Sequence, residues 1–395
     1  MSFSNSDKAK HGQSAQRSLE NILSECADMD YISNIKSDYR IGKDGFSNSK
    51  QFYAPFAISF KDGTKWIIFT TTSMRTDRIK GQQWDALNLK EIDKDITKAY
   101  LVYPDGINDD IKSEFVRQNK KYQENVEFST IDAIVSQDTI CNLIENYALK
   151  HKQSGQKKDI QGNNFETRIA NILKNPTNLK KWLSNDALLE GMHFDIFKKI
   201  LDIFALDKDS IKSIYATSDK KEIGKLPSGG NPKTDVLVIV TLKNKQEIFY
   251  TISCKRTSSD SVSVHQYNAD SFSDVLDKNN SNLRKLLNEF QKYGNLRDFG
   301  IENGKLLSKE LKPYLMKLTT WVLGGHGGSG TPKQKANYIL TYSNNTSISS
   351  IQKIEDYCQK LLTDVKEGHF GTPFSWTYPS KRKGKDIQLK CKILD

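Results

Sequence analysis

The residues of this sequence that could do chemistry together lie at the two ends of one segment. Residues 228–259 predict a strand, a polar turn and a second strand, because VLVIVTL and IFYTISCK are short apolar runs rich in β-branched and aromatic residues. Asp235 opens the first strand, and Lys255 closes the second with Ser253 two residues before it. A hairpin of this length brings its ends side by side, so we expect Asp235 and Lys255 to face one site.

An Asp at a strand start, opposite a Lys at the end of the partner strand, is similar to the skeleton of the PD-(D/E)xK nucleases. That resemblance implies that Asp235 holds a divalent metal ion, that Ser253 occupies the place of a second ligand, and that Lys255 orients or polarises the attacking water. Another interpretation stays open. A Thr-Asp pair before a strand is common turn chemistry, and a lysine at a strand end often only keeps the strand soluble.

Composition and charge indicate a folded, basic protein. The chain has 395 residues with 36% hydrophobic and 10% aromatic content, enough for two or three domains. Its net charge of +11 suits a polyanionic partner, although an anionic membrane surface would also fit. No run approaches the roughly 20 apolar residues of a membrane helix, and the first residues lack the apolar core of a signal peptide. Dispersed cysteines without a C-x-x-C pair favour reduced thiols in a cytoplasmic protein over a structural zinc site; they are Cys26, Cys141, Cys254, Cys358 and Cys391.

The first 150 residues predict a separate N-terminal α/β domain. We expect residues 1–14 to be polar and mobile, followed by a helix, a hairpin with an Asp62-Gly63 turn, a helix and a strand. That order is similar to the PD-(D/E)xK core, and residues 73–86 resemble the stretch after the catalytic lysine of many restriction endonucleases. The catalytic residues are absent, since the second strand ends in three threonines at 70–72. A decayed nuclease-like fold that aids DNA binding or packs on the second domain, and an unrelated α/β module, are both open interpretations.

A polar, lysine-rich stretch at 148–162 predicts a linker between domains of residues 1–150 and 151–395. A helix is expected to begin at Asn163 or Asn164, which would place Glu166 in its first turn, where a carboxylate favours the helix dipole. Helices and short strands follow, and the glycine-rich residues 324–333 form a loop without the ending of a phosphate-binding P-loop. The last twenty residues hold six basic and two acidic side chains. They suit contacts with DNA, or simply form a solvated strand.

Several separate motifs in one order resemble the MspI restriction endonuclease family over residues 160–395. They are GG-x-PKTD at 229–235, the steps of 18 and 20 residues from Asp235 to Ser253 and Lys255, VSV at 262–264, FGT-x-x-x-WTY-x-S at 370–380 and Q-x-K at 388–390. The resemblance implies an α/β fold with a restriction-endonuclease-like core, in which helices flank a mixed central sheet. It does not extend to the first 150 residues.

The same resemblance assigns roles residue by residue. Asp235 would bind the metal, and Lys255 would orient or polarise the attacking water. Glu166 matches a helix glutamate that reaches the metal site through water. Ser253 stands where the family has Asn, and a hydroxyl is a weaker donor to a hard cation than a carboxylate. Five residues match positions that contact the recognition sequence: Ser263, Thr377, Ser380, Gln388 and Lys390.

The function implied by the resemblance is that of a type II restriction endonuclease. It would depend on Mg²⁺, cut double-stranded DNA at CCGG after the first C, and require a matching cytosine methyltransferase in its host. Two alternatives remain open. One is a structure- or damage-directed nuclease of the same fold, and the other is a DNA-binding protein without catalytic activity, in which Ser253 marks a dead site.

Overall fold

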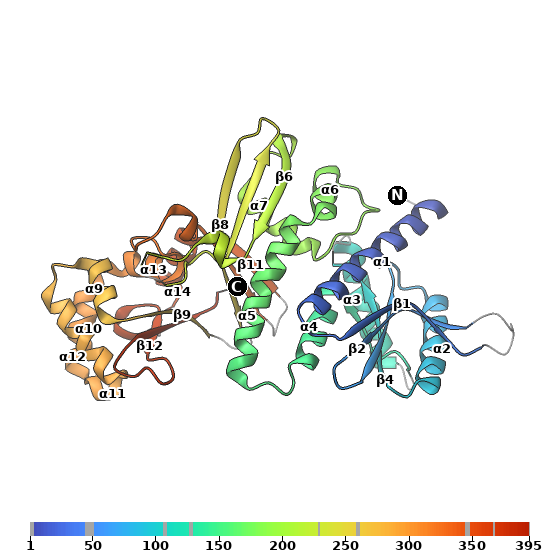
Figure 1. Cartoon of the computed structure of the whole chain (residues 1–395), viewed down its shortest axis with the longest axis horizontal. Coiled ribbons are helices and arrows are strands. Elements are labelled where there is room, and N and C mark those ends of the chain that lie inside the picture. Colours follow the sequence, from blue (N-terminus) through green and yellow to red (C-terminus); the bar gives the residue numbers. More distant parts are fainter. Residues whose placement is uncertain are drawn as a thin grey trace. The chain divides into compact units, whose positions relative to one another are not determined.

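The computed structural model describes most of the chain (Figure 1), namely residues 4–43, 51–105, 109–125, 129–227, 230–257, 261–343, 348–365 and 368–394. Residues 228–229 and 258–260 of the predicted hairpin region lie outside the described residues. The chain divides into two compact units, one of Met1–Ile160 with Ile172–Lys198 and one of Gln161–Asn171 with Lys199–Asp395. Two helices cross this division, α5 (Ser154–Lys174) and α7 (Phe194–Phe204).

The first unit is built on a five-stranded sheet of order β1-β2-β3-β4-β5. The first three strands pair antiparallel, and β4 and β5 add in parallel. Its elements are α1 (Asn5–Asp28), β1 (Asn34–Ile41), β2 (Phe52–Ser59), β3 (Lys65–Thr70), α2 (Thr76–Ile92), β4 (Ile96–Tyr103), α3 (Asp109–Asn125), β5 (Ala133–Ser136), α4 (Gln137–Ala148) and α6 (Pro176–Ser184).

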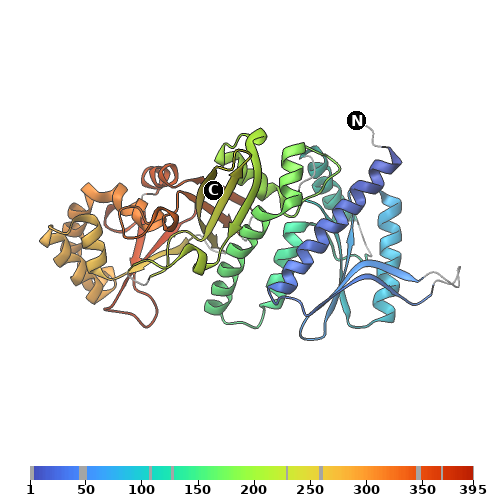
Figure 2. The same ribbon diagram turned by 45° about the horizontal axis from the view of Figure 1, so that its top comes forward.

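Helices cover both faces of this sheet because alternate side chains of each strand point to opposite faces. On β3, Ile67 and Phe69 pack in one core with Leu89 of α2. Trp66 points the other way and contacts Tyr147 of α4 at a ring distance of 5.0 Å. Figure 2 shows α1 lying across one face of the strands.

The structure confirms the hairpin around Asp62-Gly63 and corrects the start of the chain. Helix α1 begins at Asn5, capped by the Ser4 hydroxyl, so the prediction of a mobile segment over residues 1–14 is wrong from there on. The predicted helix extends ten residues further back because a capping box with Asp7 satisfies its first amide groups. Strand β1 was not predicted, because most of its side chains are exposed and carry no apolar pattern.

The second unit contains a five-stranded sheet of order β11-β10-β8-β7-β6 and a three-stranded sheet of order β12-β13-β9. Its strands are β6 (Ile211–Thr217), β7 (Val236–Leu242), β8 (Glu247–Thr257), β9 (Ser261–Tyr267), β10 (Tyr338–Ser343), β11 (Ile348–Lys353), β12 (Phe374–Thr377) and β13 (Ile387–Lys392). Its helices are α8 (Lys220–Ile223), α9 (Ala269–Asp277), α10 (Ser281–Tyr293), α11 (Leu296–Phe299), α12 (Ile301–Leu311), α13 (Leu315–Gly324) and α14 (Ile354–Asp364), with short 3-10 turns at Lys208–Ser210, Lys312–Tyr314, Pro332–Gln334 and His369–Gly371.

The predicted hairpin forms the centre of the larger sheet. β7 pairs antiparallel with β8, and β8 pairs in parallel with β10. The smaller sheet rests with one face on a helical core, in which Leu389 and Trp376 pack with Phe272 and Phe290. The helices predicted over 282–323 and the loop over 324–333 are present, whereas the edge strand β11 was not predicted.

Helix α5 corrects two expectations about the region around the predicted linker. It begins at Ser154 rather than at Asn163 or Asn164, so most of residues 148–162 are helical instead of forming a flexible linker. Glu166 therefore lies in the middle of a 21-residue helix and not in its first turn. The helix-dipole explanation for Glu166 does not hold, because that effect is confined to the terminal turn.

The two five-stranded sheets repeat one arrangement. In each, three strands form an antiparallel meander (β1-β2-β3 and β6-β7-β8), and a later strand adds in parallel to the third (β4 and β10). Helices precede both meanders. The decayed nuclease-like fold and the unrelated module both stay open as predictions for the first unit. Thr70 lies at the end of β3. In the second unit the corresponding part of β8 carries Ser253–Lys255, which contact the Asp235 carboxylate.

We predict that the stability of the first unit depends on its contacts with the segment Ile172–Lys198. Removing residues 1–150 alone would expose this segment. Glu190 is buried there and contacts His11 Nε2 at 2.6 Å and Lys181 Nζ at 2.7 Å. His11→Ala should lower the free energy of unfolding by about 1–3 kcal/mol, because the buried carboxylate loses one partner. Urea unfolding measures this, with exposed Lys10→Ala as the control. Equal stability of the two variants would contradict the prediction.

Candidate active site and recognition sheet

The pairing of β7 with β8 places Asp235 beside the end of its partner strand. Val236 lies opposite Ile252, and the pairing continues one residue further, where the Asp235 amide donates to the Ile252 carbonyl at 2.8 Å. This brings the Asp235 side chain to the segment Ser253–Lys255. The β-branched residues of β7 favour a strand, and the pairing of this strand with β8 brings Asp235 next to Ser253–Lys255.

One carboxylate oxygen of Asp235 is held by three donors. Its Oδ2 accepts from the Cys254 amide at 2.8 Å, the Lys255 ammonium at 3.1 Å and the Ser253 hydroxyl at 3.2 Å. The Ser253 side chain is buried, with the residue fully shielded from solvent. The structure thus brings the three predicted residues together, and Ser253 supports the carboxylate of Asp235 through its hydroxyl.

The other oxygen of Asp235 faces a residue that the sequence analysis missed. Lys220 Nζ lies 3.5 Å from Asp235 Oδ1 and 3.0 Å from Glu166 Oε2, so its ammonium bridges the two carboxylates. Lys220 is the first residue of the short helix α8, which is capped by the Asp219 side chain. The Asp-Lys-Lys-Glu pattern there shows a helix start, but nothing in the sequence relates it to residues 166 and 235.

The buried setting shifts the acidity of both carboxyl groups in opposite directions. Burial opposes ionisation of Asp235, but the ammonium groups of Lys255 and Lys220 and the Cys254 amide outweigh it, so the pKa of Asp235 lies below its ordinary value. Burial, reinforced by the charge of Asp235, raises the pKa of Glu166 to about 7. Two carboxyl groups with such different acidities near one lysine are typical of a functional site.

The residues present fit a divalent cation. Asp235 Oδ1 and Glu166 Oε2 contact the same ammonium, so they already share one cation, and carboxylate oxygens are the ligands that hard divalent ions prefer. Within the described ranges, no group of three or more His, Cys, Asp or Glu side chains could hold a metal ion. Ligands beyond these two carboxylates would come from backbone carbonyl oxygens, water or a bound phosphate.

The three-stranded sheet gathers four of the five predicted DNA contacts. Lys390 pairs with Ser263 of β9, and Gln388 pairs with Thr377 of β12. The Gln388 amide also donates to the Ser263 hydroxyl at 2.9 Å. The intervening Leu389 packs into the core, so these polar side chains lie on the opposite face of the sheet.

The rest of the C-terminal segment extends this face. Ser380 is exposed in the turn that follows β12. Sequence analysis missed Ser375, which pairs with Lys390, and Gln266, which pairs with Gln388. β13 is the central strand of its sheet, so one face of the C-terminal segment is buried while the other is exposed.

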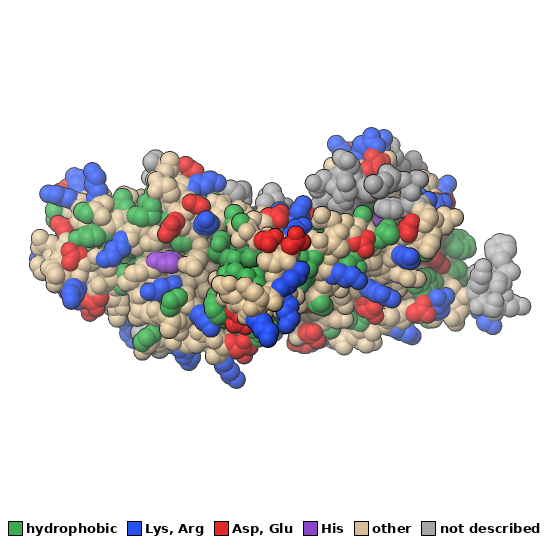
Figure 3. All heavy atoms as spheres, turned by 90° about the horizontal axis from the view of Figure 1, so that it is seen from above, with side chains coloured by type: hydrophobic (Ala, Val, Ile, Leu, Met, Phe, Trp, Pro, Cys, Tyr) green, Lys and Arg blue, Asp and Glu red, His purple; other side chains and the backbone are tan. Residues whose placement is uncertain are grey.

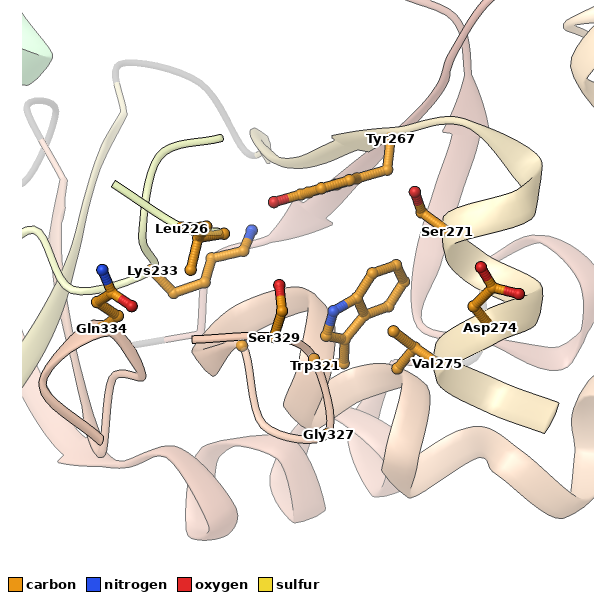
Figure 4. A pocket seen from close by; sticks show the side chains of 12 residues that line it. Leu226, Lys233, Tyr267, Ser271, Asp274, Val275, Trp321, Gly327, Ser329 and Gln334 are labelled. Atoms are coloured by element: carbon orange, nitrogen blue, oxygen red, sulfur yellow. The ribbon is translucent and has the colours of Figure 1, made fainter. Parts of the chain in front are cut away.

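Lys233 connects the residues before β7 to the three-stranded β12-β13-β9 sheet. Its ammonium donates to the carbonyl of Val264, the neighbour of Ser263, at 2.7 Å. The side chain borders a cavity of about 370 Å³ that is also lined by Tyr267 and Trp321. Figure 4 shows Lys233 extending along this cavity toward Tyr267. Lys233 thus links the residues before β7 to β9 of the smaller sheet.

Comparison with known proteins identifies the family. The family described as "Restriction endonuclease MspI" matches residues 140–391, which include every site residue described above. The chain belongs to the MspI restriction endonuclease family. It is a type II restriction endonuclease of the MspI and BsuFI type, and hence a site-specific deoxyribonuclease.

Individual relatives agree with this family assignment. The type II restriction enzyme BsuFI of Bacillus subtilis is 28% identical over 388 residues, covering 91% of this chain and 93% of BsuFI, which makes it a relative rather than the same protein. The type II restriction enzyme MspI of Moraxella sp is 26% identical over 250 residues, covering 61% of this chain and 93% of MspI.

Comparison with solved structures agrees on the fold of the family. A crystal structure of restriction endonuclease MspI in complex with its cognate DNA matches 64% of this chain and 98% of that one, with a TM-score of 0.53 and 23% identity. The predicted restriction-endonuclease-like α/β core with a mixed sheet is therefore confirmed. No described helix of this family member is long and apolar enough to span a membrane.

We predict that Lys233 makes stability depend on pH. Burial and the nearby Lys255 lower the pKa of Lys233 from 10.5 to about 7. Between these values the unfolded chain binds a proton that the folded chain does not, so stability rises with pH from about 7 to about 10 and is lost as the pH falls. Lys233→Met should remove this rise. Urea unfolding of both proteins at pH 7, 8, 9 and 10 tests it, and parallel curves would contradict it.

Proposed function

We propose that this chain recognises CCGG in double-stranded DNA and hydrolyses the phosphodiester bond after the first C, with Mg²⁺ as cofactor. The observation that carries the proposal is the convergence of Asp235, Glu166 and Lys255 in the same compact unit as the polar face of the β12-β13-β9 sheet. The three charged residues suit phosphodiester hydrolysis, and the polar face of the sheet suits contacts with bases.

Each residue of the cluster has a role in this chemistry. Asp235 and Glu166 would hold the divalent ion, and Mg²⁺ suits their oxygen ligands. Bound there, the ion would neutralise charge on the phosphate and lower the pKa of a bound water. Lys255 is 15% exposed and contacts Asp235, so it keeps a fixed positive charge where negative charge develops on the phosphate. Ser253 and the Cys254 amide hold the carboxylate in place.

Recognition would come from the exposed face of the smaller sheet. In the major groove, guanine presents two acceptors and cytosine one donor. Gln388 and Lys390 can donate to guanine, while the hydroxyls of Ser263, Thr377 and Ser380 can donate or accept. The solved MspI structure is a complex with its cognate DNA, which supports DNA binding by the matching part of this chain.

The first unit would assist as a decayed nuclease-like domain that aids DNA binding. Its support is the repeated strand arrangement and the match to BsuFI, whose 91% coverage of this chain includes most of that unit. On the face shown in Figure 3, lysine and arginine side chains are interspersed with acidic ones. The net charge of +11 would thus act through many dispersed contacts with DNA. A cytosine methyltransferase would protect the cytoplasmic DNA of the host.

The proposed specificity predicts a defined digest. A plasmid with mapped CCGG sites, incubated with Mg²⁺, should give discrete fragments whose ends carry two-base 5′ overhangs beginning after the first C. Omitting Mg²⁺ should leave the plasmid intact. Fragments that end at another sequence would refute CCGG recognition, and cleavage confined to branched substrates would favour the structure-directed nuclease. Tight binding without cleavage would favour an inactive DNA-binding protein.

The catalytic assignment predicts that Asp235→Asn and Lys255→Ala each slow cleavage at least about 10²-fold while DNA binding is retained, since each removes a charge that acts on the reacting phosphate. Single-turnover cleavage and a gel-shift assay measure the two properties. Lys245→Ala, in the turn at the far end of the same hairpin, is the control and should cut normally. Near-normal cleavage by either site variant would show that the site is misassigned.

The recognition sheet predicts a loss of discrimination when Gln388 is changed. Gln388→Ala should reduce the preference for CCGG over sites with one changed base by about 1–3 kcal/mol, because it removes one base contact. Cleavage rates on matched oligonucleotides measure this preference. Gln359→Ala, at an exposed position of α14, is the control. An unchanged preference in the Gln388 variant would remove this residue from the recognition surface.

A further inference from the structure

The two oxygens of the Asp235 carboxylate have different surroundings. Oδ2 accepts from the Ser253 hydroxyl, the Cys254 amide and the Lys255 ammonium. Oδ1 faces Lys220, whose ammonium also contacts Glu166 Oε2. A cation that binds both carboxylates must therefore use Oδ1 and Oε2, because Oδ2 already has its donors. Lys220 occupies that position.

The two lysines of the cluster differ in how firmly they are held. Lys255 is 15% exposed, and its ammonium also donates to the Cys254 carbonyl at 2.9 Å. Lys220 is 35% exposed and extends from the four-residue helix α8. The Lys220 side chain can therefore turn toward solvent without disturbing the β7–β8 hairpin, whereas Lys255 cannot.

Charge balance makes the lysine and a metal ion alternatives. With both carboxylates ionised, Lys220 and Lys255 neutralise the cluster. A divalent ion bound to the same two oxygens would lie within a few ångströms of the Lys220 ammonium, and like charges at such distances repel strongly in a partly buried site. The same oxygen pair cannot serve both cations at once.

We propose that Lys220 is a built-in counter-cation that occupies the metal position of the free enzyme and is displaced when a divalent ion binds. This inference rests on the proposed function, because it takes Asp235 and Glu166 as the metal-binding carboxylates. Lys220 keeps these buried carboxylates paired before the metal arrives, since an unpaired buried charge is costly. Once displaced, it becomes a free ammonium beside the bound phosphate. Metal binding to the DNA-free protein is accordingly weak.

Binding of Mn²⁺ to the DNA-free, full-length protein tests the proposal. Mn²⁺ serves as a paramagnetic probe, and titration is followed by electron paramagnetic resonance. Lys220→Gln should bind Mn²⁺ at least tenfold more tightly than the unmodified protein, because the competing charge is gone. Lys221→Gln, at the exposed neighbouring position on α8, should bind with unchanged affinity. Unchanged or weaker binding by Lys220→Gln overturns the proposal and makes Lys220 a structural ion-pair partner.

A measurement on the unmodified protein gives the answer even if the variant does not fold. Reductive methylation followed by peptide mass spectrometry reports how accessible each lysine amine is. Mn²⁺ should increase labelling of Lys220 and leave that of Lys221 unchanged. Equal or lower labelling of Lys220 with Mn²⁺ would overturn displacement.

A third variant separates this inference from the proposed site. Asp235→Asn should abolish Mn²⁺ binding if the site is correct. If Asp235→Asn loses Mn²⁺ while Lys220→Gln behaves like the unmodified protein, the site stands and the displacement fails. If Asp235→Asn binds Mn²⁺ normally, the proposed metal site itself fails.

Discussion

The structure of the site depends on how the Asp235 carboxylate is held. This group is buried at the point where β7 meets the end of β8, and burial alone would favour its neutral form. Three donors on Oδ2 and a lysine at Oδ1 reverse that preference. All three donors to Oδ2 come from the segment Ser253–Lys255, so the register of one strand pair sets the charge state of the site. A slip of one residue would turn Lys255 to the other face of the sheet.

The hairpin could be predicted because its signals are local. VLVIVTL is apolar and β-branched, the turn is polar, and both charged residues stand at strand ends. The same applies to the turn at Asp62-Gly63, where Gly63 adopts a positive φ of 85° that glycine tolerates. The missed strands β1, β6 and β11 lie at the edges of their sheets. Edge strands carry polar side chains, so pairing with a neighbour, rather than an apolar pattern, defines them.

The partners of the site could be predicted only in part. Glu166 matched a family position, but its location in mid-helix depends on α5 beginning at Ser154, within a stretch whose polar composition indicates a linker. Lys220 could not be predicted, because it reaches the site from a separate short helix, and only the folded chain shows that residues 166, 220 and 235 meet. The predicted DNA-contact residues are far apart in sequence, and the register of β9, β13 and β12 brings four of them together.

The β7–β8 hairpin and the β12-β13-β9 sheet, which carry the proposed catalytic and recognition residues, are connected in two ways. β9 follows β8 within a few residues, so Lys255 and Ser263 lie on consecutive strands of different sheets. Lys233, two residues before Asp235, binds the carbonyl of Val264, the neighbour of Ser263. Any displacement of the β12-β13-β9 sheet would therefore act on both strands of the hairpin that carries Asp235 and Lys255.

The serine at position 253 determines where the negative charge of the site must come from. A carboxylate at this position would add a second charge next to Asp235, but Ser253 is neutral and uses its hydroxyl to hold Oδ2. Glu166 then supplies the second negative charge, from a helix rather than from the hairpin. Burial and the charge of Asp235 raise the pKa of Glu166 to about 7 even with the Lys220 ammonium beside it, so that charge is only partly present near neutral pH. Lys220 and Lys255 lower the pKa of Glu166, but they only partly offset its burial and the charge of Asp235.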